Sequence, residues 1–171
     1  MPAPLDPECL FRVLREHQVD YVLIGGLGAV LHGSPALTND ADIVPSRDPA
    51  NVQRLADALR SLDARLRVTE SPDGVEFEPH PALLQSMAML NLTTRCGDLD
   101  LTFSPAALDD YAALVDHSVV FDIAGGPVRV AALSDIIRSK EAAGRPKDHA
   151  TLPVLRALEE EIGRDQAKRQ T

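Results

Sequence analysis

The stretch that most constrains this chain runs from Val22 to Val44 and reads VLIGGLGAVLHGSPALTNDADIV. A short apolar run ends at the pair Gly25-Gly26, a segment of helix length follows, and Asp40 and Asp42 then stand two residues apart. Glycines between a strand and a helix let the backbone approach a ligand closely, and free amides at a helix N-terminus favour a phosphate. The stretch therefore predicts a strand, a short helix and a second strand around a polar turn.

Asp40 and Asp42 have the spacing at which strand side chains share a face, because the strand period is two. If residues 39–44 form a strand, both carboxylates project together. Two hard oxygen ligands at one edge suit Mg²⁺, or Mn²⁺, held jointly with substrate phosphates. Glycines and carboxylates together thus indicate binding of a metal-complexed nucleoside triphosphate (NTP). The alternative is an ordinary turn followed by a solvated acidic loop.

A second acidic pair lies in residues 98–103, which read DLDLTF. The alternation predicts a strand with its apolar residues on one face and Asp98 and Asp100 on the other. Adjacent carboxylates repel each other unless water or a cation separates them. The pair is therefore either the solvent-facing side of an edge strand or part of a metal site.

The spacing around the glycines resembles that of a known superfamily. Residues 24–26, thirteen further residues and then residues 40–43 match the signature of the DNA polymerase β-like nucleotidyltransferases, an apolar-Gly-Gly/Ser turn followed by an Asp-x-Asp/Glu strand. That resemblance implies an α/β (α+β) fold, with a mixed twisted sheet flanked by helices and a helical C-terminal part. It spans Val22 to about Leu155, and its specific residues are concentrated in 24–43.

The residues between the two motifs resemble one branch more closely. The Gly-Gly-x-Gly run, His32-Gly33 and Thr38-x-Asp40-x-Asp42 are similar to the AbiEii and MenT branch, the nucleotidyltransferase toxins of bacterial toxin-antitoxin systems. Leu37 is a departure, because that branch often has an arginine there, so any phosphate contact at this point must come from elsewhere.

The resemblance assigns roles to particular residues. A third acidic residue between two apolar ones is part of the family pattern, which points to Asp100 as the third metal-binding carboxylate and leaves Asp98 as the alternative. The resemblance also implies that Gly25 and Gly26 cradle a phosphate. Thr38 becomes a possible phosphorylation site, because some antitoxins of the MenT branch act as kinases at this kind of position.

Basic residues near the C-terminus supply the charge that a triphosphate needs. Lys140 falls on the apolar face of a predicted helix over 134–143, where it either extends to solvent or meets a phosphate in a cleft. Lys140 and the following Arg145-Pro146-Lys147-Asp148 run resemble the Lys...Asp pattern of the toxin branch. Lys140 and Asp148 are therefore candidate catalytic residues, with Arg145 and Lys147 as further phosphate ligands.

Length and composition bound the remaining possibilities. The 171 residues suit one domain, expected over 1–163 with a helical part at about 132–163, followed by a flexible tail over 164–171. Neither a membrane span nor a signal peptide is indicated. Cys9 and Cys96 are too few for a disulfide framework, so we expect two reduced core cysteines and a cytoplasmic location.

Charge separates the candidate partners. A formal net charge of −9 argues against broad DNA binding, because nonspecific binding depends on a basic surface. The leading hypothesis is a Mg²⁺-dependent toxin that transfers nucleotides from an NTP to RNA, by analogy the 3′ end of a tRNA, and is neutralised by a cognate antitoxin. One alternative is transfer to a protein hydroxyl or to an aminoglycoside-like small molecule. Another is a catalytically idle nucleotide-binding module.

The remainder of the chain reads as helices and hairpins. Helices are predicted over about 7–18, from Asp48-Pro49, from Ser104-Pro105 and beyond Arg145. The helix from Asp48-Pro49 has a core-facing apolar stripe of Val52, Leu55, Ala56 and Leu59, and the last helix is expected to turn Leu152, Leu155, Leu158 and Ile162 inward. Hairpins are predicted around 66–77, with a turn at residues 71–74, and around 119–131.

Overall fold

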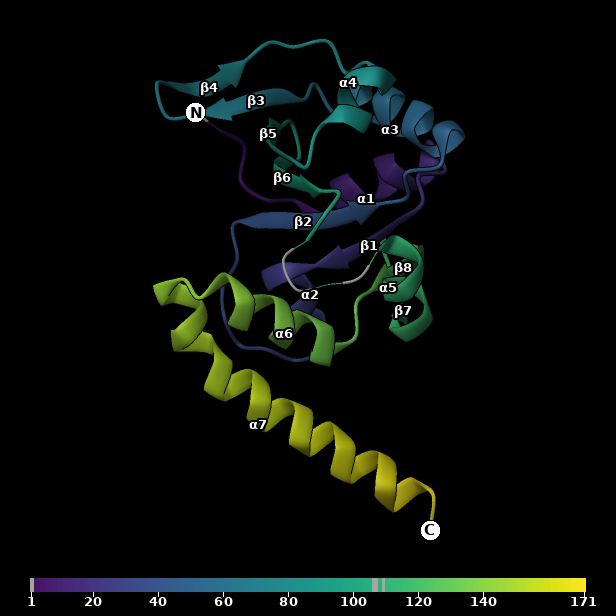
Figure 1. The fold of residues 1–171 in the computed structure, drawn as a ribbon, viewed down its shortest axis with the longest axis vertical. Coiled ribbons are helices and arrows are strands. Elements are labelled where there is room, and N and C mark those ends of the chain that lie inside the picture. The colour runs from purple at the N-terminus through teal and green to yellow at the C-terminus, as the bar shows by residue number, and fades with distance from the viewer. Residues whose placement is uncertain (1, 106–107, 109) are drawn as a thin grey trace.

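The computed structural model describes residues 2–105, 108 and 110–171 of the chain. Within these residues eight strands form one sheet in the order β4-β3-β5-β6-β2-β1-β8-β7 (Figure 1). The sheet is mixed, because β2 pairs with β6 and β1 with β8 in parallel while the other neighbours are antiparallel. The strands are β1 (Tyr21–Ile24), β2 (Asp40–Pro45), β3 (Arg65–Val68), β4 (Ser71–Val75), β5 (Met89–Thr94), β6 (Gly97–Thr102), β7 (Val119–Ile123) and β8 (Gly126–Val130).

Helices cover both faces of the sheet. They are α1 (Pro7–Glu16), α2 (Gly25–Leu31), α3 (Pro49–Ser61), α4 (Pro81–Ser86), α5 (Tyr111–His117), α6 (Leu133–Ala143) and α7 (Pro146–Arg169). One buried cluster joins Leu23 and Ile43 of the sheet to α1, α3 and α4. A second joins Val22, Ile24 and Val44 to α5, α6 and α7. Successive strand residues thus serve opposite cores, so the sheet lies between two layers of helices and the predicted α/β fold is confirmed.

Local sequence explains where the helices begin. The Asp6 side chain accepts a hydrogen bond from the Cys9 amide at 3.0 Å, and Pro7 occupies the first turn of α1. The stripe of α3 predicted from its period is fully buried, with Val52 and Leu55 among its members. Each such side chain contributes roughly 1.5–3 kcal/mol on leaving water. Helices α1 and α3 therefore follow directly from the sequence pattern, whereas α4 was not predicted.

Three element boundaries differ from expectation. Residues 71–74 lie in strand β4 rather than in a turn, because Leu66 pairs with Val75 and Val68 with Ser71, which moves the reversal to residues 69–70. The helix expected from Ser104-Pro105 falls partly on residues 106, 107 and 109, outside the described part of the chain, and α5 begins at Tyr111 with Asp110 as its N-cap. The last helix continues to Arg169, so residues 164–169 are helical and not a flexible tail.

The second half of α7 extends beyond the rest of the molecule in Figure 1. Its apolar residues Leu152 and Leu155 are buried, and Leu158 and Ile162 are partly buried against the second core, as the sequence pattern predicted. In the part of the chain that the structure describes, no helix is both long enough and apolar enough to cross a membrane.

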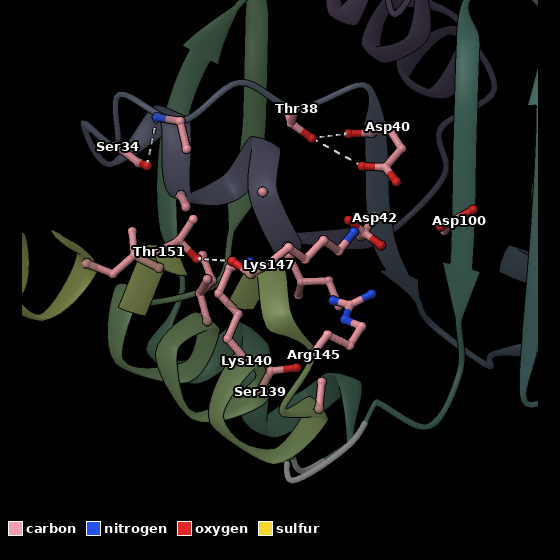
Figure 2. Close-up of a pocket in the computed structure, with 18 of the residues that line it drawn as sticks. Ser34, Thr38, Asp40, Asp42, Asp100, Ser139, Lys140, Arg145, Lys147 and Thr151 are labelled. Carbon is pink, nitrogen blue, oxygen red and sulfur yellow. Dashed lines mark hydrogen bonds between the residues drawn. The ribbon is translucent and has the colours of Figure 1, made fainter. Parts of the chain in front are cut away.

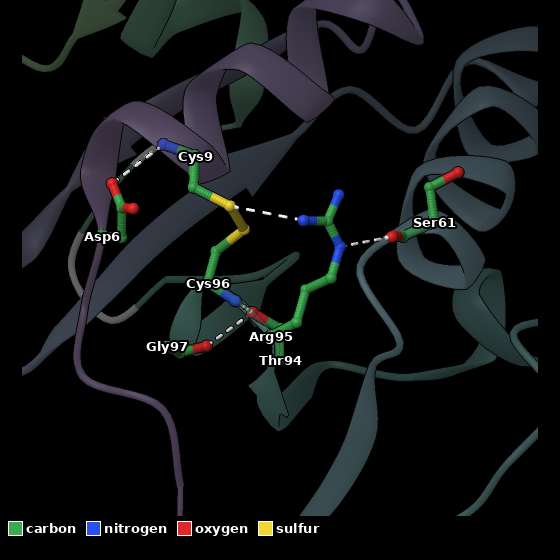
Figure 3. Close-up of a disulfide and its surroundings, with 7 residues drawn as sticks. All are labelled: Asp6, Cys9, Ser61, Thr94, Arg95, Cys96 and Gly97. Carbon is green, nitrogen blue, oxygen red and sulfur yellow. Dashed lines mark hydrogen bonds between the residues drawn. A yellow bond between two sulfur atoms is a disulfide. The ribbon is translucent and has the colours of Figure 1, made fainter.

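Cys9 and Cys96 are joined by a disulfide, with Cα atoms 5.7 Å apart (Figure 3). This corrects the expectation of two reduced cysteines. Cys96 is buried as expected, but the strand order brings it to the N-terminal turn of α1, which the sequence separation of 87 residues did not reveal. The Asp6 amide also donates to the Cys96 carbonyl at 2.9 Å. The first turn of α1 and the residue before it are therefore both bonded to Cys96, in the β5–β6 turn.

Candidate functional site

The two acidic pairs predicted from the sequence meet in the middle of the sheet. Strands β2 and β6 run parallel, and their register places Asp40 opposite Asp98 and Asp42 opposite Asp100. Because residues 40, 42 and 44 share a strand face, these carboxylates lie on the side on which Val44 joins the second core. The acidic residues therefore face the layer of helices that contains α6 and α7.

A cavity of about 460 Å³ lies between this side of the sheet and helices α2, α6 and α7 (Figure 2). Its size suits a small molecule such as a nucleotide. It gathers almost all the predicted site residues, and those that line it are Gly25, Gly26, Thr38, Asp40, Asp42, Asp100, Lys140, Arg145 and Lys147. Of the two alternatives for the third carboxylate, Asp100 lines the cavity, whereas Asp98 is not among its lining residues.

The paired glycines form the first turn of α2, directly after β1. Gly25 has φ +68°, and a Cβ there would stand 2.1 Å from Asp42 Oδ2. A Cβ at Gly26 would stand 2.9 Å from Thr38 Oγ1. Gly25 therefore lets α2 pack closely against β2, and Gly26 lets it approach Thr38, two residues before that strand. This close packing is a role that the sequence did not reveal, and a phosphate contact at the glycines stays a prediction.

Burial and mutual repulsion dominate the electrostatics of the carboxylates. Burial, reinforced by the charges of Asp40 and Asp100, raises the pKa of Asp42 to about 7, although Arg145 and Lys147 act in the opposite direction. Burial likewise raises the pKa of Asp100 to about 6, against the lowering effect of Arg67. A positive charge entering the cavity would relieve this repulsion.

Thr38 lies beside the Asp40 carboxylate. Its hydroxyl donates to both the backbone carbonyl and the Oδ1 atom of Asp40 at 3.1 Å (Figure 2). The side chain lines the cavity. A group attached to this hydroxyl would therefore stand next to the Asp40 carboxylate.

Lys140, Arg145 and Asp148 form a charged cluster where α6 gives way to α7. Gly144, with φ +61°, ends α6 and lets the chain reverse. Asp148 is fully buried and accepts from Lys140 Nζ at 3.2 Å and from Arg145 Nε at 2.7 Å. Burial acts to raise the pKa of Asp148, but the hydrogen bonds from Arg145 and Lys140 outweigh it and lower the pKa below its ordinary value.

The members of this cluster differ in whether they reach the cavity. Asp148 lies behind the two basic side chains, which line the cavity. In Figure 2 the Lys147 and Arg145 side chains extend toward Asp42. Cations thus face the acidic wall across the cavity, an arrangement in which a bound polyanion and a divalent cation could neutralise the two sides.

Arg67 is a site residue that the sequence reasoning missed. From β3, its Nη1 atom lies 2.8 Å from Asp98 Oδ2, and its Nη2 donates to Asp100 Oδ1 at 2.6 Å. The alternation of Arg65 and Arg67 with apolar neighbours was a signal that both arginines share a strand face. Only the strand order β3-β5-β6 shows that this face meets the acidic residues of β6.

The donor set suits a hard divalent cation such as Mg²⁺ or Mn²⁺. Asp40, Asp42 and Asp100 offer carboxylate oxygens into one cavity, which is the chemistry such ions require. Among the described residues, however, no three His, Cys, Asp or Glu side chains already form a metal-binding cluster. Arg67 occupies one oxygen of Asp100. Asp40 and Asp42 are therefore the residues best placed to hold a metal ion, and Asp100 remains the predicted third ligand.

The fold is shared with solved structures of nucleotidyltransferases. The lincosamide antibiotic adenylyltransferase LnuA with lincomycin bound has a TM-score of 0.58 and 15% identity, over 91% of this chain and 99% of that protein. ANT(2″)-Ia in complex with adenylyl-2″-tobramycin has a TM-score of 0.54 and 16% identity, over 93% of this chain and 88% of that protein. At these identities the likeness establishes the fold alone.

A third solved structure, an antigenic nucleotidyltransferase-like protein from Paracoccidioides brasiliensis, has a TM-score of 0.55 and 18% identity, over 91% of this chain and 78% of that protein. No protein-family model and no curated protein matches the sequence.

Proposed function

We propose that this protein is a metal-dependent nucleotidyltransferase that uses an NTP as its donor. The observation that carries the proposal is the register of β2 and β6, which brings Asp40, Asp42 and Asp100 to one wall of a cavity whose other wall holds Lys140 and Lys147. Carboxylates alone would repel a triphosphate, and cations alone would not hold Mg²⁺. The two together suit a metal–triphosphate complex.

In such a reaction an acceptor hydroxyl oxygen attacks the α-phosphorus of the NTP. The new P–O bond forms as the bond to pyrophosphate breaks, and pyrophosphate leaves with the electron pair. Asp40 and Asp42 would hold the metal, which supplies stabilisation of charge on the attacking and leaving oxygens. Lys140, Arg145 and Lys147 would bind the triphosphate oxygens.

Two further roles follow from the positions of the remaining residues. Asp100 would either complete the metal site or accept the proton of the attacking hydroxyl. Asp148 would hold Lys140 and Arg145 at the cavity wall, because it is fully buried and bonded to both. Gly25 and Gly26 would cradle a phosphate through the backbone amides at the start of α2.

The acceptor that the sequence resemblance supports is RNA, at the 3′ end of a tRNA, which would make the protein the toxin of a toxin-antitoxin pair. The basic residues that line the cavity at 140–147 are consistent with an RNA end bound locally. Because the chain has a net charge of −9, it would then bind RNA only through these basic residues at the cavity. Transfer to tRNA would block translation.

Control by a cognate antitoxin that acts as a kinase would take place at Thr38. Its hydroxyl lies 3.1 Å from Asp40 Oδ1, so a phosphate there would add about −1.5 to −2 charge beside the carboxylates. That group would compete with the NTP for Mg²⁺ and repel its phosphates. Full transfer activity in protein shown by mass spectrometry to be phosphorylated at Thr38 would contradict this part of the proposal.

The second candidate acceptor is a cationic small molecule. Two observations favour it: the net charge of −9, and the fold shared with LnuA and ANT(2″)-Ia, whose names link them to lincomycin and tobramycin. An acidic surface attracts a cationic aminoglycoside.

One experiment separates the candidates. Purified protein is incubated with Mg²⁺ and each α-labelled NTP in turn, together with total cellular RNA, lincomycin or tobramycin, and the Asp42→Asn variant serves as the inactive control. Label in tRNA supports the toxin, label in an antibiotic supports the second candidate, and no label in any acceptor with any NTP contradicts both.

A further inference from the structure

The guanidinium group of Arg67 bridges the two carboxylates of β6. Its Nη1 and Nη2 atoms lie 2.8 Å from Asp98 Oδ2 and 2.6 Å from Asp100 Oδ1. All three side chains are largely covered, with exposed fractions of 32%, 25% and 16% for Arg67, Asp98 and Asp100. A planar fork that donates to two carboxylates fixes both more firmly than a point charge does.

The two acidic strands differ in how their charge is compensated. In the part of the chain that the structure describes, Asp40 and Asp42 of β2 form no ion pair within 4 Å, whereas both acidic residues of β6 pair with Arg67. The two pairs stand directly opposite each other in the sheet. One acidic pair therefore carries its own cation, and the other is left for a cation that comes from outside.

We propose that Arg67 is a positioning residue of this site: it acts as the internal counter-ion of Asp98 and Asp100, holds Asp100 at the cavity wall and so directs the divalent metal to Asp40 and Asp42. The inference rests on the proposed function, since it concerns the same cavity. Arg67 does not line that cavity and acts through Asp100, which does.

Loss of Arg67 has two consequences. Without the guanidinium, Asp98 and Asp100 lose the cation bonded to them and add to the repulsion of Asp40 and Asp42 on the neighbouring strand. Mg²⁺ therefore stabilises the Arg67 variant more than it stabilises the wild type. Asp100 also loses the partner that fixes its carboxylate, which slows transfer by about 10- to 100-fold. The NTP contacts from Lys140, Arg145 and Lys147 are untouched, so the KM for NTP stays near the wild-type value.

The chain offers a matched control on the same strand. Arg65 has a side-chain exposure of 33%, close to that of Arg67, but it pairs with the exposed Glu76 at 3.4 Å and not with the acidic residues of β6. We compare Arg67→Gln, Arg67→Lys and Arg65→Gln with the wild type. Two readouts are measured: the rise in melting temperature that Mg²⁺ causes without nucleotide, and kcat and KM for NTP.

The expected result is a larger Mg²⁺-induced rise in melting temperature for Arg67→Gln than for the wild type and Arg65→Gln, with a lower kcat and an unchanged KM for NTP. Arg67→Lys keeps the charge without the fork, so its Mg²⁺-induced rise stays close to that of the wild type while kcat is intermediate. A merely structural role would lower the melting temperature by the same amount with and without Mg²⁺ and leave kcat unchanged, which would overturn the proposal.

The experiment distinguishes failure of the Arg67 proposal from two other outcomes: a variant that does not fold, and a failure of the proposed function. If Arg67→Gln does not fold, Arg67→Lys decides: a reduced kcat at constant KM supports positioning, and a wild-type kcat overturns it. If the wild type itself transfers no nucleotide, the proposed function fails, and the Mg²⁺ measurement still tests whether Arg67 is the counter-ion. If the wild type is active and Arg67→Gln matches Arg65→Gln in both readouts, only the Arg67 proposal fails.

Discussion

Asp42 occupies the space that a side chain at Gly25 would need: a Cβ at Gly25 would stand 2.1 Å from Asp42 Oδ2 and 2.7 Å from its carboxyl carbon. The first turn of α2 can therefore approach β2 only because residue 25 is glycine. This contact joins the two halves of the motif that organises the chain, the glycine turn and the acidic strand.

Gly25→Ala should abolish transfer and destabilise the fold, because the new methyl group displaces the Asp42 carboxylate. Gly125→Ala is the matched control: Gly125 has a similar φ of +76°, but a Cβ there would meet no described residue within 4 Å beyond its chain neighbours. The control carries only the backbone cost, about 1 kcal/mol. Thermal melts and label incorporation measure both effects. Equal melting temperatures for the two variants would contradict the close contact.

Asp42→Asn should remove transfer activity while it stabilises the metal-free protein at neutral pH. The pKa of Asp42 is raised to about 7, mainly by burial and then by Asp40 and Asp100. The carboxyl group of Asp42 therefore contributes stability that is fully present below its pKa in the unfolded state, near 4. This stability is lost as pH rises through its pKa in the folded state, about 7. We expect the variant to melt about 2–8 °C above the wild type at pH 8, from a gain of about 1–2 kcal/mol, and at nearly the same temperature at pH 4.

The control for this pH dependence is Asp116→Asn, which changes an exposed aspartate that is not among the cavity-lining residues. We measure melting temperatures in EDTA from pH 4 to pH 8. The difference in melting temperature between Asp116→Asn and the wild type should not increase comparably as pH rises. If the difference in melting temperature between Asp42→Asn and the wild type does not grow with pH, that would count against charge repulsion between Asp42 and its acidic neighbours.

Asp148→Asn should destabilise the protein strongly, because Lys140 and Arg145 would lose their shared buried counter-charge. Breaking a buried ion pair by removing one partner costs about 3–5 kcal/mol. The pKa of Asp148 is lowered by its hydrogen bonds to Arg145 and Lys140, which outweigh the effect of burial. Its contribution is therefore present above the unfolded pKa, near 4, and is lost as pH falls through the lower folded pKa. Urea unfolding at pH 7 and pH 3 measures this, and a destabilisation that persists undiminished at the lowest pH would argue against the ion pair.

Lys140→Ala should impair NTP binding more than folding. The Lys140 side chain is 14% exposed and lines the cavity, so its loss removes one charge-assisted contact to a phosphate, and KM for NTP should rise about tenfold. Lys168→Ala, an exposed position near the end of α7, is the control. A nucleotide titration that gives the same KM for Lys140→Ala and the wild type would leave Lys140 with a structural role only.

Removal of the disulfide should lower the free energy of unfolding by about 2–5 kcal/mol, because the bridge closes a loop between residues separated by 87 positions. The variant carries Cys9→Ser and Cys96→Ala together. Dithiothreitol should destabilise the wild type to a similar extent and leave the variant unchanged. Equal urea midpoints for oxidised and reduced wild type would contradict a stabilising bridge.

The sequence by itself determined the elements of the site. Period-two alternation predicted that Asp40 and Asp42 share a strand face and that Asp98 and Asp100 share another, and helix periodicity predicted the buried stripe of α3. Helix periodicity likewise placed Lys140 on the apolar face of its helix, whereas Asp148 stood out only through the resemblance to the toxin branch. These features depend on neighbours in the chain, whose geometry is fixed by the regular backbone.

Only the tertiary structure decided which distant elements meet. The parallel pairing of β2 with β6 aligned the two acidic pairs, and the strand order brought Arg67 to Asp98 and Asp100. The same packing brought Cys9 to Cys96. No local pattern encodes such pairings, because strand order and register depend on how two cores on opposite faces of one sheet bury their apolar side chains at once.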